Sequence, residues 1–175
     1  MKPRIKIVYS NYYLDELILS MLDLSKKQLK NYKIDFDIIG VPGSFEIPYE
    51  ISRSIKEDTI NKQTQIGSFK GKQKEKIRDN IVQIAKLSQL NLNNQPIYSG
   101  YLALGCIIKG NTINHSAIST SIFTNLQRIG VENVIPIGNG IFNANDMDEA
   151  REKYTKCTYH AIETLLILLK NEKKS

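Results

Sequence analysis

A lysine, a glycine, two small polar residues and a histidine lie close together in the segment 109–115. Lys109 supplies positive charge, and the hydroxyl of Thr112 can donate a hydrogen bond to a phosphate oxygen. The amides of Asn111 and Thr112 precede a predicted helix, where free N–H groups favour an anion. His115 can move protons near neutral pH. The spacing predicts an anion site with a proton-transferring group beside it, and the alternative interpretation is a connecting loop with a capping threonine and a surface histidine.

Two elements position this segment. The apolar run Tyr98–Ile108 predicts a buried strand, and Gly110 permits a turn after it. Apolar residues then recur at helical spacing, which predicts a helix over Ile118, Ile122, Leu126 and Ile129. The order of strand, polar turn and helix places the candidate residues at the carboxyl end of a strand.

The N-terminal part of the chain also alternates strand and helix. We predict a first strand at Ile5–Tyr9, a helix from Leu14 to about Lys30, and a second strand at Ile34–Val41. Pro42-Gly43 signals a turn, and Ser44 is predicted to cap the helix that follows.

The C-terminal part adds a fourth strand at Val134–Phe142, which Gly138-Asn139-Gly140 is predicted to interrupt. Asn145-Asp146 is predicted to cap a further helix, whose Asp148 and Glu149 suit the positive end of the helix dipole. Strands and helices alternate four times, so we expect a parallel sheet with helices on both faces. In such folds ligands bind beyond the carboxyl ends of the strands, where the polar loops at 10–13, 42–46 and 109–115 would converge.

Residues from about 57 to 95 do not follow this pattern, because they are rich in Lys, Gln and Asn. They predict a flexible loop followed by one amphipathic helix at roughly 74–90. We interpret the stretch as an insertion in a single domain over residues 1–175. Its basic residues between Lys70 and Arg78 are interpreted as a solvated face, with RNA or DNA binding as the alternative. The stretch lacks interleaved aromatic residues for base stacking, so we predict no nucleic-acid partner.

Composition narrows the classes of protein further. The chain has 175 residues, a hydrophobic content of 41% and a formal net charge of +6. No apolar run reaches the ~20 residues that a bilayer-spanning helix needs, and no signal-peptide pattern precedes the first strand. Cys106 and Cys157 are the two cysteines, which is too few for a disulfide framework. We therefore expect a cytoplasmic protein with no membrane partner.

Two motifs resemble those of the lumazine synthases. The segment Val41–Pro48 reads Val-Pro-Gly-Ser-Phe-Glu-Ile-Pro and is similar to the family's Val-Pro-Gly-Ala-Phe-Glu-Ile-Pro. The segment Ala103–Thr112 is similar to the family's Ala-Leu-Gly-x-Val-Ile-Arg-Gly-x-Thr, and Pro136–Glu152 resembles its last strand and the helix start after it. The resemblance implies an α/β fold, a doubly wound flavodoxin-like three-layer sandwich with a four-stranded parallel sheet.

The resemblance also implies a transferase reaction. Members of the family condense 5-amino-6-ribitylaminouracil with 3,4-dihydroxy-2-butanone 4-phosphate, which are a ribitylaminopyrimidine and a sugar phosphate. The products are 6,7-dimethyl-8-ribityllumazine, the precursor of riboflavin, together with phosphate and water. No metal and no organic cofactor is implied.

By this resemblance, Tyr12 would stack on the pyrimidine ring, and the alternative is a loop tyrosine that packs on its own domain. Ser44 and Phe45 would offer backbone groups to the ribityl chain. Glu46 would accept hydrogen bonds from ribityl hydroxyls, or would serve only the helix dipole. Three residues would line the pyrimidine pocket mostly through their backbone, with the cysteine thiol itself structural: Cys106, Ile107 and Ile108.

The phosphate and the proton are assigned by the same resemblance. Asn111 and Thr112 would hold the phosphate group. The family's general acid/base histidine comes two residues after the threonine, where this sequence has Asn114, and His115 comes one residue later. A shift of one residue at a helix start rotates a side chain by about 100°, so the reach of His115 is open at this point.

Two further departures concern the edges of the site. The family's phosphate-binding arginine aligns with Lys153, which keeps the charge but loses bidentate geometry. An aromatic residue that the family takes from a neighbouring subunit aligns with Asn139. Because family sites lie between the subunits of a pentamer, we expect a homopentamer rather than a shell, since residues 153–158 contain no glycine linker. The alternative is a catalytically weakened pentamer that binds lumazine or a flavin.

Overall fold

The computed structural model describes residues 3–68, 98–110 and 114–172. The predicted helix at 74–90, the basic stretch 70–78, and Asn111 and Thr112 lie outside these ranges. By its internal contacts the chain divides into two compact units, one of residues 1–52 and 98–175 and one of residues 53–97. The single domain over 1–175 with an insertion at about 57–95 stays a prediction.

The first unit is built on a sheet of four parallel strands in the order β2-β1-β3-β4. The strands are β1 (Arg4–Ser10), β2 (Asp35–Val41), β3 (Gly100–Ile108) and β4 (Ile137–Ala144). This confirms the predicted four-stranded parallel sheet. β4 runs through Gly138 and Gly140 without a break, because both glycines pair in register with β3, so the predicted interruption is wrong.

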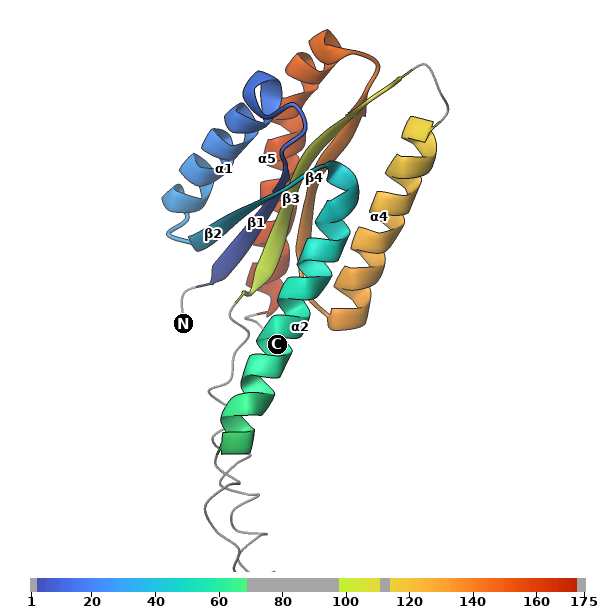
Figure 1. Ribbon diagram of the computed structural model, residues 1–175. Coiled ribbons are helices and arrows are strands. Elements are labelled where there is room, and N and C mark those ends of the chain that lie inside the picture. The colour runs from blue at the N-terminus through green and yellow to red at the C-terminus, as the bar shows by residue number, and fades with distance from the viewer. Residues whose placement is uncertain (1–2, 69–97, 111–113, 173–175) are drawn as a thin grey trace, which may run out of the picture. The chain divides into compact units, whose positions relative to one another are not determined.

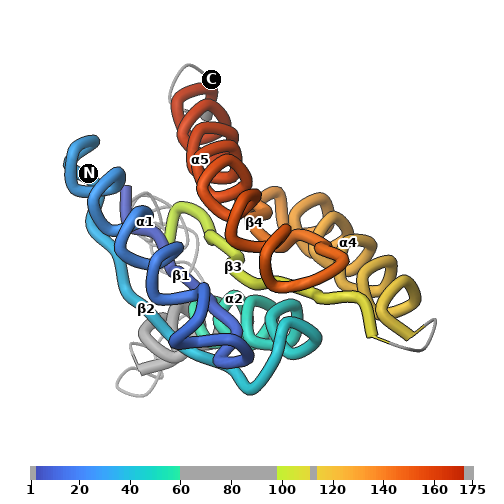
Figure 2. Tube along the Cα trace, turned by 90° about the horizontal axis from the view of Figure 1, so that it is seen from above, coloured from blue at the N-terminus to red at the C-terminus, as the bar shows by residue number. Residues whose placement is uncertain are grey.

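Helices cover both faces of this sheet. Figures 1 and 2 show α1 and α5 on one face and α4, with the first turns of α2, on the other. A π-helical turn, η1, precedes α1, and a 3₁₀ turn, η2, precedes α2. The helical elements are η1 (Leu14–Ile18), α1 (Leu19–Asn31), η2 (Ser44–Glu46), α2 (Ile47–Ser68), α4 (Asn114–Asn133) and α5 (Met147–Glu172).

Alternation along the strands divides the core between the two faces. Ile5 and Ile7 of β1 pack with Leu102 and Leu104 of β3 in the cluster that α1 and α5 cover. Residues of the opposite register, such as Val8 and Ala103, are also fully buried, as expected when both faces of a parallel sheet are covered.

Two helix ends carry a non-glycine residue in the left-handed conformation. Lys33 follows α1 with φ 56°, and Val134 follows α4 with φ 49°. After α4, the amide of Ile135 donates to the Gly130 carbonyl at 3.0 Å and the amide of Val134 donates to the Val131 carbonyl at 3.3 Å. This pair of hydrogen bonds is the Schellman motif, in which the left-handed position usually holds glycine.

Three local predictions are corrected. Ser44 does not cap α2, because it is buried within η2, whose N-cap is Gly43. The loop expected from residue 57 onward is wrong at its start, since α2 continues to Ser68. No glycine of the described ranges has a positive φ, so Gly110 does not adopt the left-handed backbone conformation that glycine allows in a tight turn.

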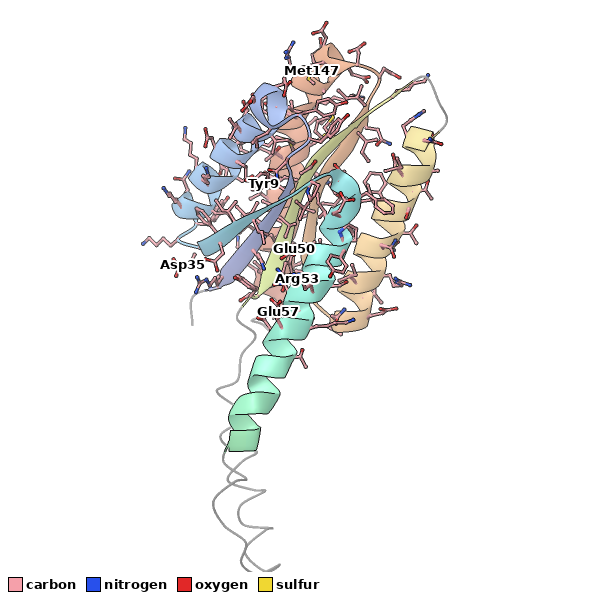
Figure 3. The ribbon with its side chains drawn as sticks, in the orientation of Figure 1. Tyr9, Asp35, Glu50, Arg53, Glu57 and Met147 are labelled. Carbon is pink, nitrogen blue, oxygen red and sulfur yellow. The ribbon has the colours of Figure 1, made fainter. Side chains whose placement is uncertain are left out.

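Residues 53–68, in the second unit, continue α2, where Arg53 and Glu57 form an ion pair one turn apart (Figure 3). Within the described part of the chain, no helix combines the length and the apolar character that crossing a bilayer requires.

Candidate functional site at the carboxyl edge of the sheet

The ends of β3 and β4 and the starts of α4 and α5 form a cavity of about 230 Å³. Met147, labelled in Figure 3, marks the start of α5 beside it. The cavity brings together three cationic or titratable side chains that the sequence singled out, and five further residues complete its lining. These are Lys109, His115 and Lys153, with Ser116, Asn143, Ala144, Asn145 and Glu149.

Hydrogen bonds of the buried residue Ser119 hold the first turn of α4, which carries His115, at this cavity. Ser119 lies one turn along α4, is 3% exposed, and donates from its hydroxyl to the His115 carbonyl at 2.6 Å. The same hydroxyl oxygen lies 2.8 Å from Oδ1 of Asn143 in β4. The His115 ring also lies beside Ser116, with Nε2 at 3.1 Å from its hydroxyl. Ser119 therefore fastens the first turn of α4 to the end of β4, and His115 lines the cavity while Asn114 is exposed outside it.

Lys153 is already paired inside the cavity. Its ammonium forms an ion pair with Glu149, one turn earlier on α5. The other carboxylate oxygen of Glu149 accepts a hydrogen bond from the Asn145 amide at 2.5 Å, and Asp146 accepts one from the Glu149 amide at 2.8 Å. The Lys153 partner holds the pKa of Glu149 below its usual range, and Glu149 raises the pKa of Lys153. Both groups are therefore charged at neutral pH.

The turn after β2 carries the next group of predicted residues. Ser44 packs against β3, where a side chain at Gly105 would come within 2.5 Å of the Ser44 hydroxyl oxygen. Only a glycine at 105 leaves room for this hydroxyl, which is buried and has no hydrogen-bond partner among the described residues. Glu46 is half-buried, and its amide donates to the Gly43 carbonyl at 3.3 Å.

Phe45 and Tyr12 present aromatic rings to solvent. Phe45 is 59% exposed and lines a second cavity of about 270 Å³ between the start of α2 and α4, with Tyr49 and Arg128 among its neighbours. Tyr12 is 62% exposed, and its ring meets that of Tyr13 edge to face at a centroid distance of 4.7 Å. Tyr12 is thus available for stacking on a planar ligand.

The end of β3 is buried on both faces. Cys106 belongs to the core under α1 and α5, where burial raises the pKa of its thiol to about 12. Ile107 is buried on the opposite face, and Ile108 is half-buried. Contributions from these residues to a ligand would come from the backbone.

Asn139 lies in a different place. It is exposed on β4 and lines an open, apolar groove of about 690 Å³ with the second half of α4 and the end of α5. The groove contains Val131 and Val134, which are 71% and 84% exposed, and Leu168. Within one chain, Asn139 and His115 therefore line separate cavities.

Sequence reasoning missed two polar residues that support the cavity, Ser119 and Asn143, and it missed the contacts of Glu149 with Lys153 and the Asn145 amide. One signal was present, since Glu149 and Lys153 are four residues apart on a predicted helix and oppositely charged. Asn143 lies near the end of β4 and Asn145 directly follows this strand, whose carboxyl end meets the same sheet edge as that of β3. The contact of Ser119 with Asn143 joins two elements and has no sequence signal.

The fold and this cavity define a doubly wound α/β protein with a polar, cation-bearing site at the carboxyl edge of a parallel sheet. The family model described as 6,7-dimethyl-8-ribityllumazine synthase matches residues 77–170, which is more than half of the chain. The chain therefore belongs to the lumazine synthase family, and its α/β architecture is the flavodoxin-like fold predicted from the resemblance.

Individual relatives agree with this assignment. The chain is 30% identical over 145 residues to a 6,7-dimethyl-8-ribityllumazine synthase of Buchnera aphidicola, with 83% of this chain and 67% of the relative covered. It is 27% identical over 150 residues to the enzyme of the same name from Afipia carboxidovorans, with 86% and 71% covered. The corresponding protein of Agrobacterium fabrum is 26% identical over 149 residues, with 85% and 78% covered.

Proposed function

We propose that this protein is a transferase that condenses 5-amino-6-ribitylaminouracil with 3,4-dihydroxy-2-butanone 4-phosphate. The products would be 6,7-dimethyl-8-ribityllumazine, phosphate and water. The observation that carries the proposal is the single cavity in which Lys109, His115 and Lys153 meet, in a chain that belongs to this family. Two cationic side chains suit a phosphate group, and an imidazole beside them suits proton transfer.

The predicted residues that contact the substrates take the following roles in this proposal. His115 moves protons during imine formation and ring closure, and Lys153 and Lys109 attract the phosphate. Asn111 and Thr112 complete the phosphate site from the segment between β3 and α4. On the pyrimidine side, Tyr12 stacks on the ring, Glu46 accepts hydrogen bonds from the ribityl hydroxyls, and backbone groups of Ser44, Phe45, Cys106, Ile107 and Ile108 complete the contacts.

The test mixes purified protein with the two substrates and follows lumazine by absorbance and fluorescence against the uncatalysed rate. His115→Ala should lower kcat by about 10²–10⁴-fold if the imidazole transfers protons. The matched control is His160→Ala, because His160 is the other histidine and lies exposed on α5, outside the cavity. Equal rates for the two variants would reject the role of His115. Asn114→His tests the family position, and a gain in rate there would show that His115 is the poorer proton carrier.

Glu46 is tested through the other substrate. Glu46→Gln replaces charge-assisted hydrogen bonds by neutral ones and should raise KM for the pyrimidine by about tenfold. KM for the sugar phosphate should change little, because Glu46 does not line the cavity of Lys153. An unchanged KM for the pyrimidine would count against this role.

We further propose a homopentamer in which the Asn139 groove of one subunit adjoins the Lys153 cavity of the next. The support is that these features are separate in one chain and that the groove exposes apolar side chains. Mass measurement in solution tests the assembly, and a monomer would refute it. The cytoplasmic location expected from the cysteine content stays a prediction that cell fractionation can test.

A second function is favoured by the residues at positions 114 and 139. Both are exposed asparagines where the resemblance expects a histidine and an aromatic ring. A pentamer with a weakened site would bind lumazine or a flavin without forming it. Copurification of such a ligand, with no product above the uncatalysed rate, would favour this alternative.

A further inference from the structure

Glu149 already binds the ammonium and the backbone amide that an anion in the cavity would contact. Its carboxylate pairs with the Lys153 ammonium through one oxygen and accepts the Asn145 amide through the other. That amide lies just before α5, where free N–H groups and the helix dipole favour negative charge. Glu149 is therefore an internal anion, held by the cation and the helix end of the predicted phosphate site.

Glu149 also reduces the net positive charge of the cavity lining. Lys109 and Lys153 contribute two positive charges to the lining, and Glu149 offsets one of them. The Glu149 side chain is 26% exposed and that of Lys153 is 46% exposed, so both can exchange partners without opening the core. A phosphate group that enters the cavity must therefore displace the Glu149 carboxylate from the Lys153 ammonium, or bind next to that carboxylate.

We propose that Glu149 is a specificity-determining residue that competes with phosphate for Lys153 and keeps phosphate binding weak. This role rests on the proposed function and adds a determinant of phosphate affinity to the same site. The reaction consumes a phosphorylated substrate and releases inorganic phosphate in the same site. When phosphate leaves, the carboxylate returns to Lys153, which speeds release and limits inhibition by phosphate.

The experiment titrates the full-length protein with inorganic phosphate by calorimetry at low ionic strength. Glu149→Gln keeps an oxygen that can accept from Asn145 but removes the charge, and it should tighten phosphate binding about fivefold. The matched control is Asp148→Asn, because Asp148 is a neighbouring acid on α5 that pairs with Arg151 at 3.3 Å and does not line the cavity. It should change binding less than about twofold, because the Asp148 side chain is 90% exposed and paired with Arg151, and the high dielectric constant of water weakens its effect on the cavity.

A double-mutant cycle separates competition from a structural effect. In a Lys153→Gln background, Glu149→Gln should lose most of its effect on phosphate binding, because the contested cation is absent. A similar gain in both backgrounds, or the same affinity in Glu149→Gln and the unaltered protein, would overturn the proposal. If Glu149→Gln is poorly folded by circular dichroism, Glu149→Ala and Glu149→Ser give the same comparison without a long side chain.

Phosphate titration also keeps this proposal distinct from the proposed function. Tighter phosphate binding without lumazine formation would leave the competition intact and reject the synthase activity. Lumazine formation with unchanged phosphate affinity in Glu149→Gln would have the opposite meaning. When both hold, the inhibition constant of phosphate in the assay should fall by the same factor of about five in Glu149→Gln.

Discussion

Ser44→Ala should stabilise this protein. The Ser44 hydroxyl is buried and has no hydrogen-bond partner among the described residues. A buried hydroxyl without a partner costs about 1–3 kcal/mol in proteins, whereas alanine has no such group. The substitution also gives up the dispersion contacts of one atom, which are worth a few tenths of a kcal/mol up to about 1 kcal/mol. The net expectation is a gain of about 1 kcal/mol in the free energy of unfolding.

Urea unfolding followed by circular dichroism measures this difference, with the same slope expected for both proteins. Ser119→Ala is the matched control, because it removes the same atom from a buried site where the hydroxyl does have partners. It should lower the free energy of unfolding by about 1 kcal/mol, since Asn143 loses its partner. Turnover should survive Ser44→Ala, because the proposed contact of Ser44 with substrate is made by its backbone.

The neighbouring glycine gives a second measurement of the same geometry. In Gly105→Ala the new methyl group would lie 2.5 Å from the Ser44 hydroxyl oxygen and should cost about 1–3 kcal/mol through overpacking. Adding Ser44→Ala should recover most of that loss, because the next contact, with Cβ of Ser44, is 3.4 Å. A loss of stability in Ser44→Ala alone would refute the reasoning, since it would mean that the hydroxyl is hydrogen-bonded.

Three further predictions concern the frame around the site. Lys6→Met should lower the free energy of unfolding by about 1.5–3 kcal/mol, because buried Glu50 loses its charged hydrogen bond with the Lys6 ammonium, which is 3.2 Å away. A denaturant midpoint equal to the parent's would contradict this. The hydrogen bond from Arg4 lowers the pKa of Asp37, so Asp37 contributes stability above about pH 4 that is lost as pH falls through the lowered value, and Asp37→Asn should flatten the acid limb of a stability profile. Val134→Gly should raise the free energy of unfolding by about 1 kcal/mol, because it removes a β-branched residue from the left-handed conformation. Thermal unfolding measures this change. A lower melting temperature in the variant would show that contacts of the valine side chain outweigh its backbone strain.

Much of the frame could be predicted from the order of residue types. Apolar runs such as Ile5–Tyr9 and Tyr98–Ile108 predicted β1 and β3 to within two residues, because strands buried on both faces need continuous apolar sequence. Helical spacing predicted α4, and Asp146 caps α5 as expected. The loop predicted from residue 57 was wrong because polar composition does not stop a helix: residues 57–66 contain no glycine or proline, and α2 continues to Ser68.

For the candidate site, some features follow from local sequence and others only from tertiary packing. The sequence by itself determined the parallel sheet, the edge where its polar loops meet, and the family motifs, since each depends on local pattern or short spacing. Only the tertiary structure decided that His115 lines the cavity while Asn114 does not, because that depends on the rotation of α4 that Ser119 and Asn143 hold. Only the tertiary structure showed that Asn139 lines a separate groove, because α4, β4 and α5 come together there from distant parts of the chain. It also showed that the ion pair of Glu149 with Lys153 lies inside the cavity.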